Sequence, residues 1–313
     1  MPPDAPLLNC NQAVAFIRLN SRLVNLKYVF YACQSQAVLA PLLNVKKVGT
    51  IGNLNLEQIG AVEIPLPPLS EQQRLAALLD KADHLRRTRR YAQQLSDTFL
   101  QSVFLEMFGD LSINSARYDM AVFDDVVASS KIGLVRSSEE MKNDHPYAYV
   151  RMDAIIGDGT LDLERLRRVK ATPAEVAANS LQPSDFLFNT RNSRELVGKT
   201  ALFTQPGLYL FNNNILQVRF KETVAPEYMT GLFQTQWAKQ RLEKIKAGTT
   251  SVFAIYYKDL RDLPIILPPL PLQQQFAQIV GRVERLRAQQ REAARQAEHL
   301  FQTLLHRAFR GEV

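Results

Sequence analysis

A short polar stretch, "NTRNSRELVGKT" at residues 189–200, carries side chains well suited to recognising another molecule. It lies between two strand-like segments, "SDFLFNT" and "KTALFTQ". Arginine pairs with guanine and asparagine with adenine when proteins read DNA, and small amide or hydroxyl donors bind phosphate. The candidate contact residues are Asn189, Thr190, Arg191, Asn192, Ser193, Arg194 and Lys199.

A second polar loop, "YLFNNNI", places Asn212, Asn213 and Asn214 directly after another strand-like segment. Asparagine also forms turns through its own side chain, so an ordinary polar loop is the simplest interpretation of each stretch taken alone. Contact with double-stranded DNA is therefore a hypothesis that depends on the rest of the chain.

No catalytic or metal-binding pattern accompanies these loops. The "VGKT" segment resembles the end of a phosphate-binding loop, but Ser193 stands where that motif requires glycine, and the residues that follow favour a strand over a helix. Two cysteines and four scattered histidines give no metal-ligand spacing. We expect a chain that is not an enzyme and that binds no cofactor or metal itself.

Composition narrows the class of protein. The net charge of +7 and the pI near 9.4 favour a polyanionic partner, and 46% hydrophobic residues are typical of a folded, core-forming chain. The sequence contains no apolar run of the roughly 18 to 20 residues that a membrane helix needs, and its first residues lack signal-peptide features. We expect a cytoplasmic protein without membrane contact.

An internal repeat decides the predicted architecture. "IPLPPLSEQQ" at residues 64–73 recurs as "IILPPLPLQQ" at residues 265–274, 201 positions later. Upstream, "YVFYACQSQ" matches "YMTGLFQTQ" and "KKVGTIGNL" matches "KAGTTSVFAI". Paired prolines hold the chain extended, so each copy predicts an extended segment that leads into a helix.

Both Pro-Pro motifs are followed by long runs with apolar residues at alternating steps of three and four. Such a 3.5-residue period predicts two helices of about 39 residues, each roughly 58 Å long, that pack as a coiled coil. Because each helix follows an equivalent segment of the repeat, we expect the two to be antiparallel. The predicted seam contains Leu78, Leu85 and Phe99 in the first copy and Ile279, Leu286 and Leu300 in the second.

The fold class that follows is α+β, with mixed α/β globular segments joined by the two helices. We predict spacer helices within 64–110 and 265–313 and a complete mixed domain at 111–264, where strand patterns alternate with the helical "APEYMTGLFQTQWAKQRLEKI". Residues 1–63 match only the end of that domain. The first copy therefore looks incomplete by roughly 90 residues.

Two copies of the Leu-Pro-Pro-Leu and Gln-Gln motif, each followed by a heptad helix, together with "NTRNSRELVGKTALF", resemble the DNA-specificity (S) subunit of type I restriction-modification enzymes. The resemblance extends from about Asn11 to Val313. It implies target-recognition domains that read the halves of a split DNA site, and helices that set the gap between them. It also implies a non-catalytic subunit that docks methyltransferase subunits, which bind S-adenosylmethionine, and a nuclease/translocase subunit.

The chain departs from this family in its first domain, for which residues 1–63 are a C-terminal remnant. Three explanations stay open: a gene remnant, the product of a split gene, or a half-subunit that forms a homodimer. The alternative function is a coiled-coil assembly protein without DNA readout. The sequence does not give the target site, because readout also depends on loop geometry and DNA shape.

Overall fold

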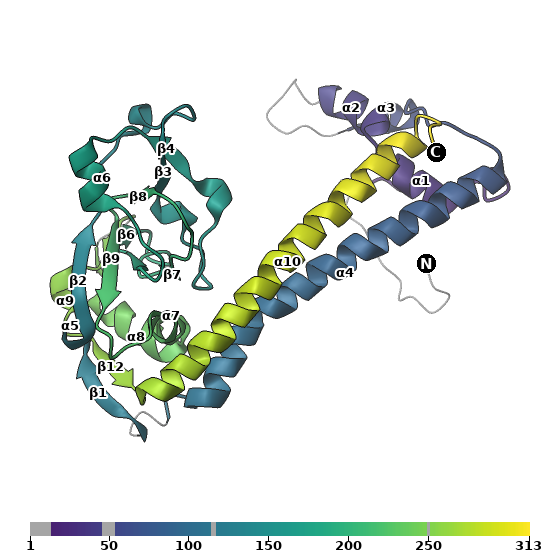
Figure 1. The fold of residues 1–313 in the computed structure, drawn as a ribbon. Helices are drawn as coiled ribbons and strands as arrows, with labels where there is room; N and C mark the ends of the chain where they lie inside the picture. Colours follow the sequence, from purple (N-terminus) through teal and green to yellow (C-terminus); the bar gives the residue numbers. More distant parts are fainter. Residues whose placement is uncertain (1–13, 46–53, 114–116, 249–250) are drawn as a thin grey trace. The chain divides into compact units, whose positions relative to one another are not determined.

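A computed structural model of the chain describes residues 14–45, 54–113, 117–248 and 251–313 (Figure 1). The chain forms two compact units. Unit 1 comprises Met1–Gln94 and Ala288–Val313, and unit 2 comprises Leu95–Arg287. Each unit contains one end of each long helix. The predicted domain boundaries follow helix and strand ends instead, and they stay a prediction.

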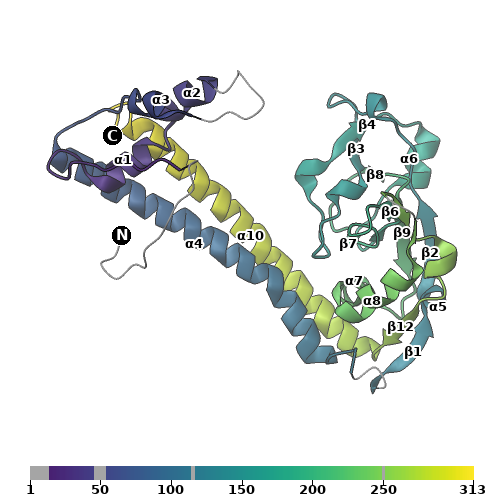
Figure 2. The ribbon, with the colours of Figure 1, turned by 180° about the vertical axis from the view of Figure 1, so that it is seen from behind.

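The repeated Pro-Pro motifs lead into the two long helices, α4 (Leu69–Phe108) and α10 (Leu270–Ala308). Figures 1 and 2 show them side by side. In unit 1, Nη1 of Arg86 in α4 forms an ion pair with Oε1 of Glu298 in α10 at 3.2 Å. In unit 2, the rings of Phe104 of α4 and Phe276 of α10 pack with centroids 5.3 Å apart. Because contact positions fall along α10 as they rise along α4, the helices run antiparallel, as predicted.

The six predicted seam residues are not the most deeply buried positions of the two helices. Leu75, Leu79, Phe301 and Leu305 are buried together in unit 1. The two ends of each long helix pack against the aromatic residues of the two units, and this packing selects the buried positions. Of the predicted seam residues, Leu78 and Ile279 are half-buried, and Leu85, Phe99, Leu286 and Leu300 are 39%, 49%, 56% and 44% exposed.

One glutamine of each repeat copy is fully buried, and its side chain joins the start of its long helix to an earlier segment of the same chain. Gln273 accepts a hydrogen bond from the Ala225 backbone N–H at 3.0 Å and donates one to the Pro268 carbonyl at 2.7 Å. Gln72 makes the equivalent two bonds in the first copy, each 2.8 Å long. The two copies of the repeat therefore share these hydrogen bonds as well as their residue types.

Within its described residues, unit 1 contains three short helices beside the long pair and no strand. The tyrosine hydroxyl of Tyr28 in α1 donates to the Pro65 carbonyl at 2.9 Å, just as Tyr228 in unit 2 donates to Ile266 at 2.8 Å. The predicted match of "YVFYACQSQ" to "YMTGLFQTQ" is thus confirmed, whereas most of "KKVGTIGNL" lies outside the described residues. The helices are α1 (Leu26–Ala32), α2 (Gln36–Val45) and α3 (Leu56–Gly60).

Unit 2 is built around an antiparallel sheet with strand order β2-β9-β5-β7. Every residue of β5 is buried, because both faces of the sheet are covered. Phe186 and Phe188 face Phe233 of α7 on one side, and Leu187 packs with Phe211 on the other. The strands are β2 (Val127–Ile132), β5 (Phe186–Asn189), β7 (Thr200–Leu202) and β9 (Ile215–Phe220).

The segment predicted as helical forms two helices, α7 (Pro226–Gln234) and α8 (Gln236–Ile245). Thr235 separates them, because its side chain accepts the Ala238 N–H and so begins α8. Phe233, Trp237 and Leu242 are buried, as their spacing predicts. The α+β fold class is confirmed.

Smaller sheets complete unit 2, with strand orders β1-β12, β10-β11-β6 and β4-β3-β8. No helix in the described part of the chain has the length and apolar content needed to span a membrane. The strands are β1 (Asp119–Val122), β3 (Tyr147–Val150), β4 (Arg167–Val169), β6 (Arg191–Asn192), β8 (Tyr209–Phe211), β10 (Ala247–Gly248), β11 (Phe253–Ala254) and β12 (Pro264–Leu267). The short helices are α5 (Phe123–Val126), α6 (Pro173–Asn179), α9 (Tyr257–Leu260), η2 (Ser138–Glu140), η3 (Met152–Ala154) and η4 (Leu163–Arg165).

Candidate nucleic-acid interface

Four segments of unit 2 meet around a concave site with a volume of about 330 Å³. Thr190, after β5, joins three of them. Its N–H and its hydroxyl donate to the Asn214 carbonyl at 2.8 and 2.9 Å, and its carbonyl accepts the Ile255 N–H at 2.9 Å. The lining residues are Ile132, Thr190, Arg191, Asn213, Asn214, Leu216, Ala254, Ile255, Tyr256 and Tyr257.

Two predicted contact residues in this site keep their donors available. Arg191 is exposed, and its guanidinium makes no hydrogen bond or ion pair with any residue that the structure describes. The side-chain amide of Asn213 is likewise without a partner among the described residues, although its backbone N–H bonds to Leu134. A guanidinium and an amide on one cavity form a donor set that can read base edges in a major groove.

Two other predicted contacts, Asn189 and Asn212, do not line the site and hold the local fold, and their contact with DNA stays a prediction. Asn189 is fully buried, and its amide donates to the Leu196 carbonyl at 3.2 Å. Asn212 is 8% exposed, and its Oδ1 accepts the Asn214 N–H at 2.7 Å. Both side chains satisfy backbone groups at strand ends, a common use of asparagine that its residue type alone does not separate from ligand binding.

Arg194 also lies outside the lining of the site. Its guanidinium forms an ion pair with Glu243 at 2.6 Å and lies 5.6 Å from the ring centroid of Phe253. Hydrogen bonds from Lys246 and then Arg194 lower the pKa of the Glu243 carboxyl below its usual range. Contact with DNA stays a prediction for the residues of this stretch that do not line the site: Asn192, Ser193, Arg194 and Lys199.

Ile132 and Tyr256 line the site but are absent from the predicted contacts. They are 47% and 49% exposed. The neighbouring Tyr257 is held by a hydrogen bond from its hydroxyl to Asp124 at 2.5 Å, and burial followed by this bond raises the pKa of its phenol. The adjacent tyrosines, directly after a strand-like segment, are the sequence signal that could have revealed this side of the site.

The segment after Ile132 runs along the second asparagine loop and fixes the spacing of the site. Leu134 donates its N–H to the Phe211 carbonyl at 2.8 Å and accepts the Asn213 N–H at 2.9 Å. A Cβ atom on Gly133 would lie 2.1 Å from the Phe211 carbonyl oxygen, so only glycine allows this approach.

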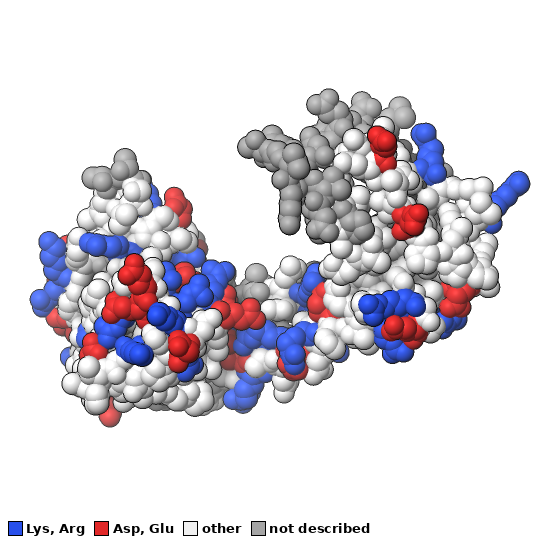
Figure 3. All heavy atoms as spheres, turned by 90° about the horizontal axis from the view of Figure 1, so that it is seen from above, with Lys and Arg blue, Asp and Glu red and all other residues white. Residues whose placement is uncertain are grey.

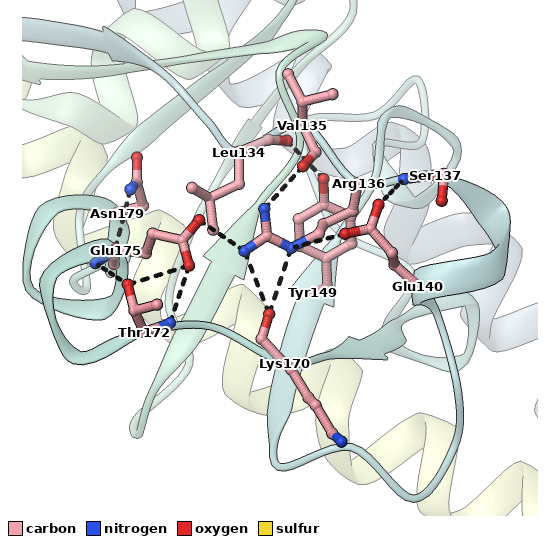
Figure 4. A network of polar contacts seen from close by, with 10 residues as sticks. All are labelled: Leu134, Val135, Arg136, Ser137, Glu140, Tyr149, Lys170, Thr172, Glu175 and Asn179. Atoms are coloured by element: carbon pink, nitrogen blue, oxygen red, sulfur yellow. Dashed lines mark hydrogen bonds and ion pairs between the residues drawn. The ribbon is translucent and has the colours of Figure 1, made fainter.

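Arg136 holds the segment after Ile132 in place through hydrogen bonds (Figure 4). Its guanidinium donates to the Val135 carbonyl at 2.8 Å, to the Lys170 carbonyl at 3.3 Å and to Glu175 at 2.8 Å. The bond from Arg136 is the main reason that the pKa of the Glu175 carboxyl is lowered. Tyr149 adds a hydrogen bond from its hydroxyl to Leu134 at 2.7 Å. The side of the site that carries Ile132 is therefore tied to a polar network.

On the face of unit 2 drawn in Figure 3, the charges do not form one uniform patch. Figure 3 shows Lys and Arg side chains interspersed with Asp and Glu on the face drawn. Many of the cations in unit 2 are paired, as Arg219 is with buried Asp185 at 2.7 Å. A surface of this kind binds a polyanion through a few available cations, such as Arg191, more than through its average charge.

The fold and the site define a class: an α+β protein with paired antiparallel helices, each preceded by a Pro-Pro motif, and a concave site lined by arginine, asparagine and tyrosine side chains. Residues 4–93 and 123–296 match the family model "Type I restriction modification DNA specificity domain". Because this match covers most of the chain, the chain belongs to that family.

Its relatives are distant. The chain is 26% identical over 285 residues to the type I restriction enzyme EcoKI specificity subunit of Escherichia coli (strain K12). That alignment covers 84% of this chain but spans 60% of the length of the curated relative.

Two solved structures share the fold. The first comes from a study of the complex assembly and conformational transition of the type I R-M system, with a TM-score of 0.54, 21% identity, and coverage of 95% of this chain and 74% of that one. The second is the S subunit of a type I restriction-modification system from M. genitalium, with a TM-score of 0.53, 14% identity, and coverage of 93% and 74%.

Proposed function

We propose that this chain is a DNA-sequence specificity subunit of a type I restriction-modification system. The observation that carries the proposal is the concave site in unit 2, where Arg191 and the amide of Asn213, neither paired with a described residue, line one cavity beside Asn214. Family membership supports the assignment of these donors to double-stranded DNA.

In this function the chain selects a sequence and does not catalyse a reaction. Methylation belongs to a partner methyltransferase subunit, which binds S-adenosylmethionine, and cleavage belongs to a nuclease/translocase subunit. The curated relative is itself named as the specificity subunit of a type I restriction enzyme, which supports this division.

The long helices offer a surface for methyltransferase subunits that is present twice. Leu85 and Leu286 are related by the repeat, and both are exposed. The same holds for the pair Phe99 and Leu300. Packing between the two long helices does not explain why apolar residues recur at these exposed positions in both repeats. Two copies of one partner, one for each repeat, account for the recurrence.

The test is to copurify the chain with the methyltransferase subunit of its own system and to select binding sequences from a random duplex library. A selected motif that is lost in Arg191→Ala supports the proposal. Partner binding with equal affinity for all duplexes would instead favour an assembly protein without DNA readout. Light scattering on the same sample distinguishes one copy of the chain from a homodimer.

A further inference from the structure

Tyr256 occupies a position where helix formation favours a different residue. It is the N-cap of α9, with φ −87° and ψ 152°, and its side chain makes no capping hydrogen bond. Asparagine, aspartate and serine are preferred at N-caps because their short side chains accept a backbone N–H of the first turn. Local folding therefore gives no reason for a tyrosine here.

The internal repeat provides a matched comparison within the chain. At the offset of 201 residues, Tyr256 corresponds to Asn55, which is the N-cap of α3. Asn55 accepts the Gln58 N–H at 2.7 Å, and Gln58 returns the bond to the Asn55 N–H at 2.9 Å. The first copy thus has a complete capping box, which Tyr256 cannot form. A residue that breaks a local folding rule while lining a cavity indicates a functional constraint.

The surroundings of Tyr256 show what its ring could contact. The ring is half-exposed at the concave site, its hydroxyl bonds to no described residue, and the Lys258 ammonium lies 5.9 Å from the ring centroid. Ile132 adds a second partly exposed apolar side chain, and Arg191 supplies the available guanidinium. Apolar and cationic groups thus share one cavity.

This combination fits the major-groove edges of DNA bases. Thymine presents a C5-methyl group that apolar side chains contact, and guanine presents the O6 and N7 acceptors that arginine reads. The minor groove carries no methyl group and distinguishes bases poorly, so an apolar ring would gain little specificity there. Single-strand stacking would call for successive aromatic platforms, whereas the hydroxyl of the adjacent Tyr257 is bonded to Asp124.

We propose that Tyr256, together with Ile132, is a specificity-determining residue that contacts the C5-methyl group of a thymine, while Arg191 donates to a neighbouring guanine. The inference rests on the proposed function, because it names the bases that the same site would read.

The experiment uses the complex with the methyltransferase subunit and the motif that it selects. Each thymine of the motif is replaced in turn by deoxyuridine, which lacks only the methyl group. We expect one such replacement to weaken binding about 3- to 10-fold, the size expected for one buried methyl contact. In Tyr256→Asn, the ratio of thymine to deoxyuridine affinity should fall to about one at that position, and Tyr256→Phe should retain it.

Stability separates this role from a structural one. Because Tyr256→Asn restores a capping residue, its unfolding midpoint should equal or exceed that of the parent chain while its thymine preference disappears. The reciprocal control, Asn55→Tyr, should lower the midpoint and leave thymine preference unchanged. A motif without any methyl-sensitive thymine, or an unchanged ratio in Tyr256→Asn, overturns this inference alone. A parent complex that selects no motif overturns the proposed function and the inference together.

Discussion

Replacing Gln273 with leucine tests whether the repeated glutamine is essential to the start of α10. Gln273 is fully buried and bonds to the Ala225 N–H and the Pro268 carbonyl. Leucine is of similar size but leaves both backbone groups without a partner. A buried, unsatisfied polar group costs about 1 to 3 kcal/mol, so the two together should destabilise unit 2 by about 2 to 6 kcal/mol.

Hydrogen exchange followed by mass spectrometry measures this loss locally, which matters because the chain has two compact units. A loss of about 3 kcal/mol accelerates exchange roughly 100-fold in segments that open with the broken contact. The largest increase in exchange rate should appear at the start of α7 and at the start of α10, the two elements that Gln273 joins.

The adjacent Gln274 is exposed and provides the matched control. Gln274→Leu should change exchange and unfolding by no more than about 0.5 kcal/mol. Equal effects of the two substitutions, or exchange that rises only in elements far from α7, would refute the reasoning from the two buried bonds.

Three further predictions concern recognition, pH and partner binding. Arg191→Ala should weaken binding to the selected motif about 5- to 150-fold, the equivalent of about 1 to 3 kcal/mol, in a fluorescence anisotropy titration, and Arg194→Ala should cost less because Glu243 already pairs that guanidinium; equal losses would contradict this ranking. The pKa of the Glu175 carboxyl is lowered in the folded chain. Its contribution to stability is therefore complete above the unfolded pKa near 4.3 and is lost as the pH falls through the lower folded value. Glu175→Gln should flatten the acid side of a curve of unfolding free energy against pH. Aspartate at both exposed repeat positions Leu85 and Leu286 should reduce copurification of the methyltransferase subunit without lowering the unfolding midpoint; full copurification would exclude this face as the docking surface.

The helices show how far pattern reasoning reaches. The Pro-Pro motifs and the 3.5-residue period predicted both long helices, because proline and periodicity act on the chain locally. Their antiparallel pairing was inferred from the internal repeat. The same pattern placed the seam on Leu85 and Leu286, which are exposed. The period alone does not distinguish Leu78 from Leu79, and the burial of Leu79 and Phe301 depends on contacts between segments more than 200 residues apart.

The candidate site shows the same division. Residue type singled out Arg191 and Asn213, and both line the concave site. It equally singled out Asn189 and Asn212, whose side chains are buried and hydrogen-bond to nearby backbone groups. An amide has the same donors and acceptor wherever it lies, so only burial and hydrogen-bond partners separate a structural asparagine from an available one.

The sequence by itself determined the internal repeat, the two helices, the α+β class and the stretch that supplies Arg191. These follow from local preferences and from residue chemistry, which a linear pattern records. Only the tertiary structure decided which apolar positions of the long helices are buried and what the buried glutamine after each Pro-Pro motif bonds to. It also decided that Ile132 and Tyr256 share a cavity with Arg191. Each of these depends on groups far apart in the chain coming within a few ångströms, and their spacing along the chain carries no record of that approach.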